Sequence, residues 1–275
     1  MTTGAEWQAA VGRNWAKMYP LTDRSFAGLT QQLLDRLERY PADEVLDVGC
    51  GAGELALALA RYRPRARIVG VDISAELIAA AQERSGERVL VEFEEGDASS
   101  WMRPGFSPGL IVSRHGVMFF PDPVAAFFHL SSIAQPDGTL AFTCFRERRQ
   151  NRWASELAAM LPTEVAAPFD PDAPGPFAFA DPARVEAILR AGGWTDIAFE
   201  PIDFAYVAGI GDDPVADAAA FFGRIGPAAP ALRALRGSPA YDPFVAAMTG
   251  WLEENRSGDT VAFPAAAWLV TARRA

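Results

Sequence analysis

Short apolar runs alternate with helical patterns along the first half of the chain. Runs typical of strands that are covered on both faces occur at 45–48, 67–72, 89–93, 110–113 and 140–145. Between them, residues 55–60, 74–84 and 124–133 have the composition or the apolar spacing of packed helices. Strands that alternate with helices predict an α/β fold, in which a mostly parallel sheet is doubly wound with helices on both faces.

The rest of the chain predicts a cover and two further strands. Apolar positions over residues 5–40 predict two helices that are separated at Pro20. Residues 146–180 are rich in proline and predict an inserted segment, after which Asp181 and Pro182 begin a helix. Strands are expected at 197–207 and 260–272, which bring the predicted sheet to seven strands.

These patterns divide the chain into four parts. We expect an N-terminal helical cover at 1–40, a core at 41–145, an inserted cap segment at 146–180, and a C-terminal part of the core at 181–275 with a helical insertion at 212–256. The two covers and the insertion are rich in aromatic residues. We therefore expect these three segments to lie over the carboxyl edge of the sheet and to enclose a mainly apolar pocket.

A glycine-rich turn follows the first strand. Gly49, Gly51 and Gly53 stand at alternate positions, which allow backbone with positive φ and let a ligand come close to the main chain. The helix after the turn points its free N–H groups at the same ligand. We therefore expect the principal binding site of the chain at this turn.

Two acidic residues flank the turn and decide which ligand fits. A dinucleotide-binding turn has the spacing G-x-G-x-x-G, whereas here Gly53 is the third glycine and Glu54 follows it. A pyrophosphate would meet the carboxylates of Asp47 and Glu54, while a cationic ligand would be attracted. S-adenosylmethionine (SAM) carries a sulfonium and an ammonium group and has no phosphate. The stretch resembles motif I of the class I SAM-dependent methyltransferases.

Two further acids stand where this family binds the nucleoside. Asp72 ends the second strand about twenty residues after the glycines, where a carboxylate can accept from both ribose hydroxyls. Asp72 could instead cap the next helix, a role for which Ser74 competes. Asp97, in the Gly-Asp-Ala sequence after the third strand, resembles the family's adenine site, although an Asp in a turn is ordinary.

The resemblance implies further contacts with the cofactor. In the family, leading helices lie over the cofactor, and a tryptophan at the place of Trp15 often touches it. Alternatively, Trp15 only forms the apolar face of its helix. Ligands of open α/β sheets bind beyond the carboxyl ends of the strands, so residues 113–118 should face the reactive end of the cofactor. With the three glycines, the expected cofactor-binding residues are Trp15, Asp47, Cys50, Asp72, Ile73, Asp97, Ala98, Ser113 and Arg114.

The resemblance covers residues 40–145 with ordered motifs and is looser over 180–275. One bacterial group of the superfamily shares the form of residues 175–182 and 264–273, but it has an aromatic residue where this chain has His115. The resemblance implies that a methyl group moves from SAM to a small organic molecule. It leaves oxygen, nitrogen, carbon and sulfur acceptors open.

His115 is the candidate catalytic residue. It follows the fourth strand, and an imidazole titrates near neutral pH. His115 would line the acceptor pocket and, where the acceptor must lose a proton, serve as the general base. The alternative is a half-buried ring that replaces phenylalanine for its shape. The neighbouring Arg114 could bind an acceptor carboxylate, depress the pKa of His115 or face solvent, and His129 looks structural because it lies in a predicted helix.

Composition and charge narrow the range of partners. The formal net charge of −10, from 25 basic and 35 acidic residues, argues against a nucleic acid as the main partner. The arginine cluster at 146–152 is expected to be a solvated loop face. The chain has two cysteines, which imply no disulfide framework and suit a reducing compartment. Its N-terminus has no signal-peptide pattern, and no apolar stretch approaches the ~18 residues that span a bilayer. We expect a soluble, cytoplasmic monomer or homodimer with no membrane partner and no metal.

Two other functions compete with methyl transfer. A NAD-dependent oxidoreductase would have a third glycine at position 54, where this chain has Glu54. A non-catalytic regulatory protein that binds SAM or adenosine would keep the sheet and lose the acceptor pocket, and the aromatic content of the cap argues against it. The sequence therefore favours an enzyme that aligns a small acceptor with the methyl group of SAM.

Overall fold

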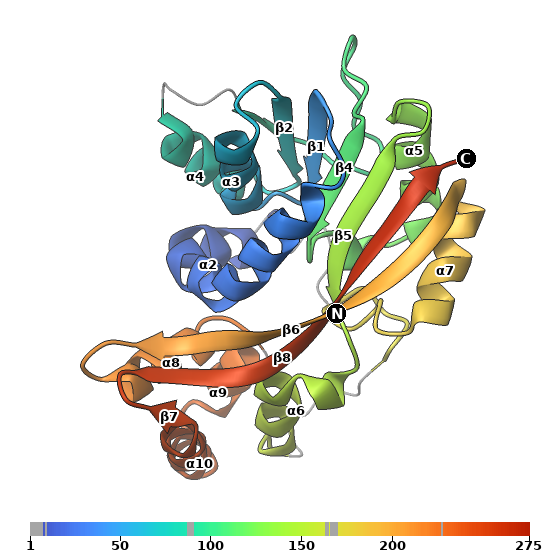
Figure 1. Cartoon of the computed structure of the whole chain (residues 1–275). Helices are drawn as coiled ribbons and strands as arrows, with labels where there is room; N and C mark the ends of the chain where they lie inside the picture. Colours follow the sequence, from blue (N-terminus) through green and yellow to red (C-terminus); the bar gives the residue numbers. More distant parts are fainter. Residues whose placement is uncertain (1–7, 9, 87–90, 163–164, 166–169, 227) are drawn as a thin grey trace.

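The chain is built on one twisted sheet (Figure 1). The computed structural model describes residues 8, 10–86, 91–162, 165, 170–226 and 228–275. The sheet has the order β3-β2-β1-β4-β5-β8-β6, and the two-residue strand β7 (Arg256–Ser257) pairs with β8 at the edge of this path. The strands of the path are β1 (Glu44–Val48), β2 (Arg67–Asp72), β3 (Val91–Glu95), β4 (Leu110–Arg114), β5 (Thr139–Phe145), β6 (Trp194–Ile210) and β8 (Thr260–Arg274).

The sheet is mostly parallel, as predicted. β1 to β5 pair with one another in parallel, and β8 runs antiparallel to both β5 and β6. Seven strands with a single antiparallel member confirm the predicted fold class. The prediction began the third strand at residue 89, and residues 87–90 lie outside the described part of the chain.

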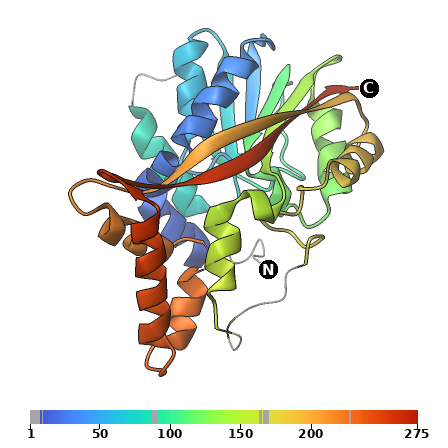
Figure 2. The same cartoon turned by 60° about the horizontal axis from the view of Figure 1, so that its bottom comes forward.

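Helices cover both faces of the sheet (Figures 1 and 2). α2 (Ala10–Leu37), α3 (Glu54–Tyr62) and α4 (Ala75–Ser85) lie on one face, while α5 (Pro123–Ile133) and α7 (Pro182–Ala191) lie on the other. Both α5 and α7 begin with an Asp whose side chain accepts from a first-turn N–H, followed by proline. For α7 this signal predicted the start at Pro182, and the helix predicted at 124–133 begins one residue earlier in the structure, at Pro123.

The expected break at Pro20 is wrong. α2 continues through Pro20 as one helix, and residues 1–7 and 9 lie outside the described part of the chain. Proline inside a helix removes one backbone hydrogen bond and costs about 3 kcal/mol. The next turns bury Leu29, Leu33 and Leu37 completely against the core, and burial of three leucines offsets a cost of that size.

β6 and β8 extend beyond the other strands. β5 ends opposite Ala267, but β6 and β8 go on pairing as far as Ile210 and Thr260. We call this two-stranded extension, residues 203–210 and 260–266, the β-arm. Because β6 runs parallel to β1–β5, the β-arm projects from the carboxyl edge of the sheet (Figure 2).

Four helices pack on the β-arm and around it. They are α6 (Arg152–Ala159), α8 (Pro214–Phe222), α9 (Ala228–Leu235) and α10 (Tyr241–Glu254). Trp251 of α10 stacks on Phe263 of the β-arm at a centroid distance of 4.3 Å, and Phe222 of α8 contacts both rings. This aromatic packing supports the continuation of β6 to Ile210, beyond the predicted end at residue 207. β8 begins at residue 260 as predicted and is two residues longer than predicted at its other end, where Arg273 pairs with Thr139 of β5.

Asn151 ties the segment after β5 to β8. Its side chain is fully buried, and its amide donates to the carbonyl oxygens of Arg146, Glu147 and Ala266. Its Oδ1 accepts from the N–H of Ala266 at 3.0 Å. One side chain thereby satisfies four backbone groups where the chain passes from β5 to α6.

Replacing Asn151 should destabilise the protein. Asn151→Ala would remove the acceptor of the buried N–H of Ala266, whose carbonyl would still accept from the N–H of Arg146, and the free energy of unfolding should fall by about 1–3 kcal/mol. Urea unfolding measures this change. The exposed Arg149→Ala serves as control and should stay within about 0.5 kcal/mol of the parent; equal effects of the two substitutions would contradict this role of Asn151.

Candidate functional site

The glycine turn connects β1 to α3 in left-handed backbone. Gly49, Gly51 and Gly53 have φ values of 64°, 56° and 82°, in a region that residues with a side chain rarely adopt. The N–H groups of Gly49 and Cys50 both donate to the carbonyl of Val71, at 2.9 and 3.1 Å. The turn is thereby held against the end of β2.

The three glycines differ in what a side chain would meet. A Cβ at Gly53 would lie 2.6 Å from the ring of Phe93, and one at Gly49 would lie 3.0 Å from Cα of Gly116. A Cβ at Gly51 would meet no atom of the described residues within 4 Å. Gly49 and Gly53 therefore allow close packing, while Gly51 faces open space, as a residue that approaches a ligand should.

Asp72 joins the turn to the end of β2. Its Oδ2 accepts from the N–H of Gly51 and its Oδ1 from the N–H of Ser74, both at 2.9 Å. Ser74 is the residue that caps α4, since its hydroxyl accepts from the N–H of Leu77. Burial raises the pKa of Asp72, and the backbone N–H groups oppose that rise. A carboxylate has about four acceptor sites, so Asp72 can hold the turn and still accept from a ligand hydroxyl.

Asp47 is a buried acid with one unpaired carboxyl oxygen. Its side chain is 1% exposed, and its Oδ2 has no hydrogen-bond partner among the residues that the structure describes. Burial, with a smaller contribution from the charge of Asp72, raises the pKa of Asp47 to about 7, against the opposing effect of Arg114. An unpaired buried carboxyl beside a left-handed glycine turn fits the ammonium or sulfonium charge of SAM.

Arg114, at the end of β4, organises a buried ionic network. Its guanidinium donates to the carboxylate of Glu54 at the start of α3 and to the hydroxyl of Thr30 in α2, the latter at 2.8 Å. Asp23 of α2 lies 3.7 Å from Arg114 and 2.8 Å from Arg84 of α4. The network fixes α2 against the start of α3 and the end of β4, beside the glycine turn.

This network changes the interpretation of the two flanking acids. Arg114 neutralises Glu54, so Asp47 is the flanking acid without an ion pair in the described part of the chain. The guanidinium does not face solvent, because its side chain is 14% exposed. It does lower the pKa of the adjacent His115, as one of the sequence interpretations had it.

Ser113 connects β4 to β1 beside the turn. Its buried hydroxyl donates to the carbonyl of Val48 at 2.7 Å and accepts from the N–H of Gly116 at 3.1 Å. Because Gly116 lies against Gly49, the bonds of Ser113 set the position of the turn relative to the segment after β4. Ser113 thus positions the site through the backbone.

His115 is buried and holds left-handed backbone. Its φ is 62°, and its N–H donates to the carbonyl of Thr143 at 3.1 Å. Its Nδ1 lies 3.0 Å from the hydroxyl of Thr143, while its Nε2 has no hydrogen-bond partner within the described residues. Burial, and secondly the charge of Arg114, lowers the pKa of His115 to about 3. The ring is therefore neutral at physiological pH.

Five aromatic rings meet beyond the carboxyl ends of β4 and β5, and we call them the five-ring cluster. Centroid distances close a circuit from His115 to Phe145 (4.1 Å), Trp153 (5.3 Å), Tyr206 (4.6 Å), Phe26 (5.5 Å) and back to His115 (5.2 Å). The members come from α2, the segment after β4, β5, α6 and β6. Segments far apart in the sequence therefore converge at one place beside the glycine turn.

The remaining expected residues lie around the turn with different exposures. Asp97 is exposed and accepts from the N–H and hydroxyl of Ser99, while the preceding Gly96 donates to the carbonyl of Asp72. Asp97 therefore stands one strand away from Asp72. Cys50 and Ala98 are buried, and Trp15 and Ile73 are half-buried. His129 bonds through Nε2 to the carbonyl of Trp101 at 2.7 Å, as a structural residue would.

Sequence reasoning missed three polar residues of the site. Asp23 and Thr30 contact Arg114 from α2, and no motif or spacing marked them. Thr143 carries the hydroxyl nearest to His115, and its signal was a lone threonine within the apolar run of β5. β4 pairs Arg114 with Thr143, which places Thr143 beside the segment that begins with His115.

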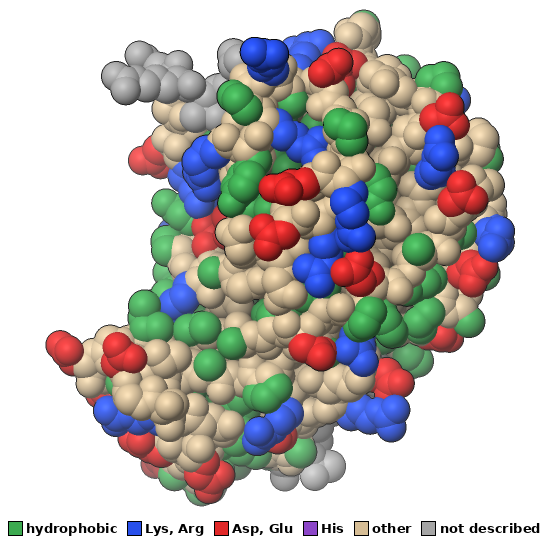
Figure 3. Space-filling model, in the orientation of Figure 1, with side chains coloured by type: hydrophobic (Ala, Val, Ile, Leu, Met, Phe, Trp, Pro, Cys, Tyr) green, Lys and Arg blue, Asp and Glu red, His purple; other side chains and the backbone are tan. Residues whose placement is uncertain are grey.

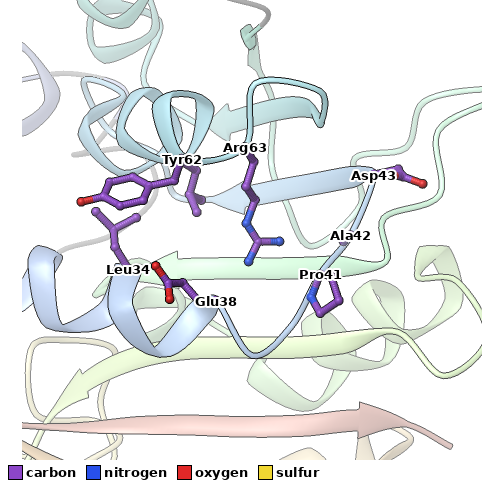
Figure 4. Close-up of a pocket in the computed structure, with 8 residues that line it drawn as sticks. Leu34, Glu38, Pro41, Ala42, Asp43, Tyr62 and Arg63 are labelled. Atoms are coloured by element: carbon purple, nitrogen blue, oxygen red, sulfur yellow. The ribbon is translucent and has the colours of Figure 1, made fainter.

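A surface hollow of about 400 Å³ lies at the opposite end of β1 (Figure 4). Its lining residues are Leu34, Glu38, Pro41, Ala42, Asp43, Leu59, Tyr62 and Arg63. Arg63 bonds to the carbonyls of Tyr40 and Leu37 and so holds the end of α2. The hollow lies at the amino end of the parallel strands, away from the glycine turn, and we assign no ligand to it.

The surface carries mixed charges. Figure 3 shows acidic and basic side chains interspersed over the face of the molecule seen in Figure 1. In the described ranges, no group of three or more His, Cys, Asp or Glu side chains could hold a metal ion. None of the described helices is long and apolar enough to cross a membrane.

Comparisons with known proteins agree with this geometry. A family described as "Methyltransferase domain" matches residues 45–138. The chain is 31% identical over 195 residues to the trans-aconitate 2-methyltransferase of Variovorax paradoxus, covering 69% of each chain. It is 29% identical over 185 residues to the nocamycin O-methyltransferase of Saccharothrix syringae, covering 62% of this chain and 66% of that protein. The crystal structure of the YcgJ protein from Bacillus subtilis has a TM-score of 0.54 at 20% identity, covering 89% of this chain and 97% of that one, and shares the fold.

A side chain at Gly51 should block SAM. Gly51→Val would put a branched side chain into the open space before the turn, and the Kd for SAM should rise tenfold or more. Gly258 has φ of 62° and equally open surroundings but lies in the turn before β8, so Gly258→Val is a control with the same backbone strain. Calorimetry on both folded variants decides the matter: equal SAM affinities would remove Gly51 from the site.

The raised pKa of Asp47 predicts a dependence of stability on pH. A carboxyl whose folded pKa lies above its usual 3.8 gives its full stability below about pH 4, and this stability is lost as the pH rises through about 7. Asp47→Asn removes this loss, so the variant should gain roughly 2–3 kcal/mol relative to the parent between pH 5 and pH 8. Urea unfolding at the two pH values, with the exposed Asp43→Asn as control, measures the gain. A constant difference between Asp47→Asn and the parent would contradict the assignment.

Proposed function

Because the chain belongs to the class I SAM-dependent methyltransferases, which act with SAM as the methyl donor, we propose that it methylates an oxygen atom of a small organic acceptor bound at the five-ring cluster. The acceptor is a small molecule, as in the related enzymes. The chain is an enzyme, so the NAD-dependent and non-catalytic alternatives fall away. The choice of oxygen and the place of binding are the parts that we propose.

The observation that carries the proposal is the position of the five-ring cluster. His115 follows β4, and Gly116 after it lies against Gly49 of the glycine turn. An acceptor among the five rings would therefore lie next to the cofactor turn. Two of the three segments predicted as a cover support this place, because α2 contributes Phe26 and α6 contributes Trp153, while Tyr206 comes from β6.

The proposed roles of the chain's residues follow from their contacts. SAM supplies an electrophilic methyl group on a sulfonium. Gly51 leaves room for it, Asp72 accepts from the ribose, and the exposed Asp97 accepts from the adenine amine. Asp47 offers a carboxylate to the cationic end. The apolar rings around the acceptor exclude water, which favours an in-line displacement that depends on alignment.

His115 fits a neutral positioning role better than that of a general base. With a pKa of about 3, the imidazole would hold an abstracted proton weakly at neutral pH. An acceptor that is already ionised needs no base. Carboxylic acids and acidic hydroxyls are ionised at neutral pH. A preference of the site for an ionised oxygen agrees with the O-methyltransferase and the trans-aconitate enzyme among the relatives.

The cytoplasm remains our expected compartment. Cys50 and Cys144 are both buried free thiols, a state that suits a reducing environment. Whether the enzyme acts as a monomer or a homodimer does not enter the proposal, because all five rings of the cluster come from one chain.

The nature of the product tests the proposed function. Purified enzyme is incubated with SAM labelled in the methyl group and separate pools of small carboxylic acids, phenols and amines, with Gly51→Val as the control with weakened SAM binding. We expect label in the acid or phenol pool, bound to oxygen. Mild alkali then distinguishes an ester, which loses its label, from an ether, which keeps it. Transfer to nitrogen or carbon alone would overturn the proposal.

A further inference from the structure

Two ring nitrogens that can form hydrogen bonds are buried in the five-ring cluster without partners. Trp153 is 5% exposed and His115 8%, and neither the Trp153 Nε1 nor the His115 Nε2 has a partner among the residues described. The hydroxyl of Tyr206, the third polar group of the cluster, bonds to the side chain of Ser25. A buried polar atom without a partner is rare in proteins and costs stability. Two of them in one ring of contacts suggest a ligand that supplies the missing partner.

The indole N–H of Trp153 can only donate, but a neutral imidazole has two tautomers. The hydroxyl of Thr143 decides between them. In the described part of the chain, the only partner of this hydroxyl is Nδ1 of His115, at 3.0 Å. If the hydroxyl donates to Nδ1, its proton is satisfied and Nε2 carries the hydrogen of the ring. If Nδ1 donates instead, the buried hydroxyl proton of Thr143 has no acceptor.

The first arrangement leaves fewer polar groups unsatisfied. It leaves one group of the pair without a partner, the Nε2–H of His115, whereas the other arrangement leaves both the Thr143 proton and the Nε2 lone pair. Thr143 therefore favours the tautomer in which His115 presents a donor. Both orphaned atoms of the five-ring cluster are then donors.

We propose that Thr143 sets the tautomer of His115, so that its Nε2–H and the Nε1–H of Trp153 together hold an oxyanion of the methyl acceptor. This inference rests on the proposed function, because it deepens the account of the same acceptor site. Two donors in apolar surroundings select an oxygen that accepts two hydrogen bonds and carries charge. The substrate class is an organic acid that is ionised before it binds, a carboxylate or an acidic hydroxyl.

The chemistry balances without a proton acceptor. The oxyanion donates an electron pair to the methyl carbon as the bond from that carbon to sulfur breaks, and the electron pair of that bond stays on sulfur. The negative charge of the acceptor and the positive charge of the sulfonium disappear together. No proton is released, so the neutral His115 never has to accept one. Thr143 is a positioning residue in this scheme, since it acts through His115.

The tautomer can be read directly, because the chain has only two histidines. Nitrogen-15 NMR of histidine-labelled protein distinguishes a protonated Nε2 from a protonated Nδ1, and His129→Gln assigns the two spectra. We expect the Nε2–H tautomer for His115 in the parent and in Thr143→Ser, which keeps the hydroxyl. Thr143→Val should give a mixture of tautomers. An Nδ1–H tautomer in the parent would overturn the role of Thr143.

The oxyanion is tested by titration with probes that do not depend on turnover. Benzoate and trans-aconitate are added to protein labelled at histidine and tryptophan nitrogens, with neutral benzamide as the control of matched shape. We expect both carboxylates to shift the Nε2 signal of His115 and the Nε1 signal of Trp153, and benzamide to shift them far less. Failure of both carboxylates to shift either signal would overturn the donor pair.

Kinetics on the identified acceptor separates this inference from the proposed function. Trp153→Phe keeps an aromatic ring and removes the donor, and it should raise the KM for the acceptor tenfold or more with an unchanged Kd for SAM. Trp268→Phe, whose indole bonds to Ala180 outside the cluster, is the control and should leave both constants unchanged. Thr143→Val should raise the KM, and Thr143→Ser should restore it. O-methylation that survives Trp153→Phe at parental KM would overturn the donor pair while leaving the proposed function intact.

Discussion

The hydrogen bond from the N–H of Gly51 to the carboxylate of Asp72 is the contact on which the proposed cofactor site depends. It joins the turn after β1 to the end of β2, and the second oxygen of Asp72 fixes Ser74 at the start of α4. Left-handed glycines have no side chains that could hold their conformation, so the turn takes its shape from its neighbours. The same carboxylate shapes the turn and is the proposed acceptor for the ribose hydroxyls. A single side chain therefore sets two of the contacts proposed for the cofactor.

Buried charge imposes the second constraint. Three carboxylates, those of Asp23, Asp47 and Glu54, lie around Arg114 in a region largely closed to water. Buried ion pairs add little net stability, but breaking one by removing a partner is costly. Arg114 therefore fixes geometry rather than adding stability: it holds α2 in place next to the cofactor turn. It leaves Asp47 as the acid that a cationic ligand can neutralise.

The sequence predicted the parts of the molecule that local pattern controls. The run to Asp72, the helix that follows it and the Asp-Pro start of α7 depend on residues within a few positions of one another, and the structure has them there. Of the two candidates for the cap of α4, the structure has Ser74. Pro20 does not end the helix, because its local cost is outweighed by the burial of leucines that pack on distant strands. The network of Asp23 and Thr30 with Arg114, and the circuit of the five rings, join residues too far apart in sequence for any spacing to show.

His115 links the glycine turn to the proposed acceptor site through its backbone. Its left-handed φ of 62° costs energy for a residue with a side chain. The conformation persists because Thr143 holds both the N–H and the imidazole of His115, while Gly116 packs on Gly49 and bonds to Ser113. A shift of the turn would therefore move Gly116, and with it the ring of His115. Residues 113–116 thus couple the position of the glycine turn to that of the proposed acceptor site, and a methyl transfer that relies on alignment depends on such rigid coupling.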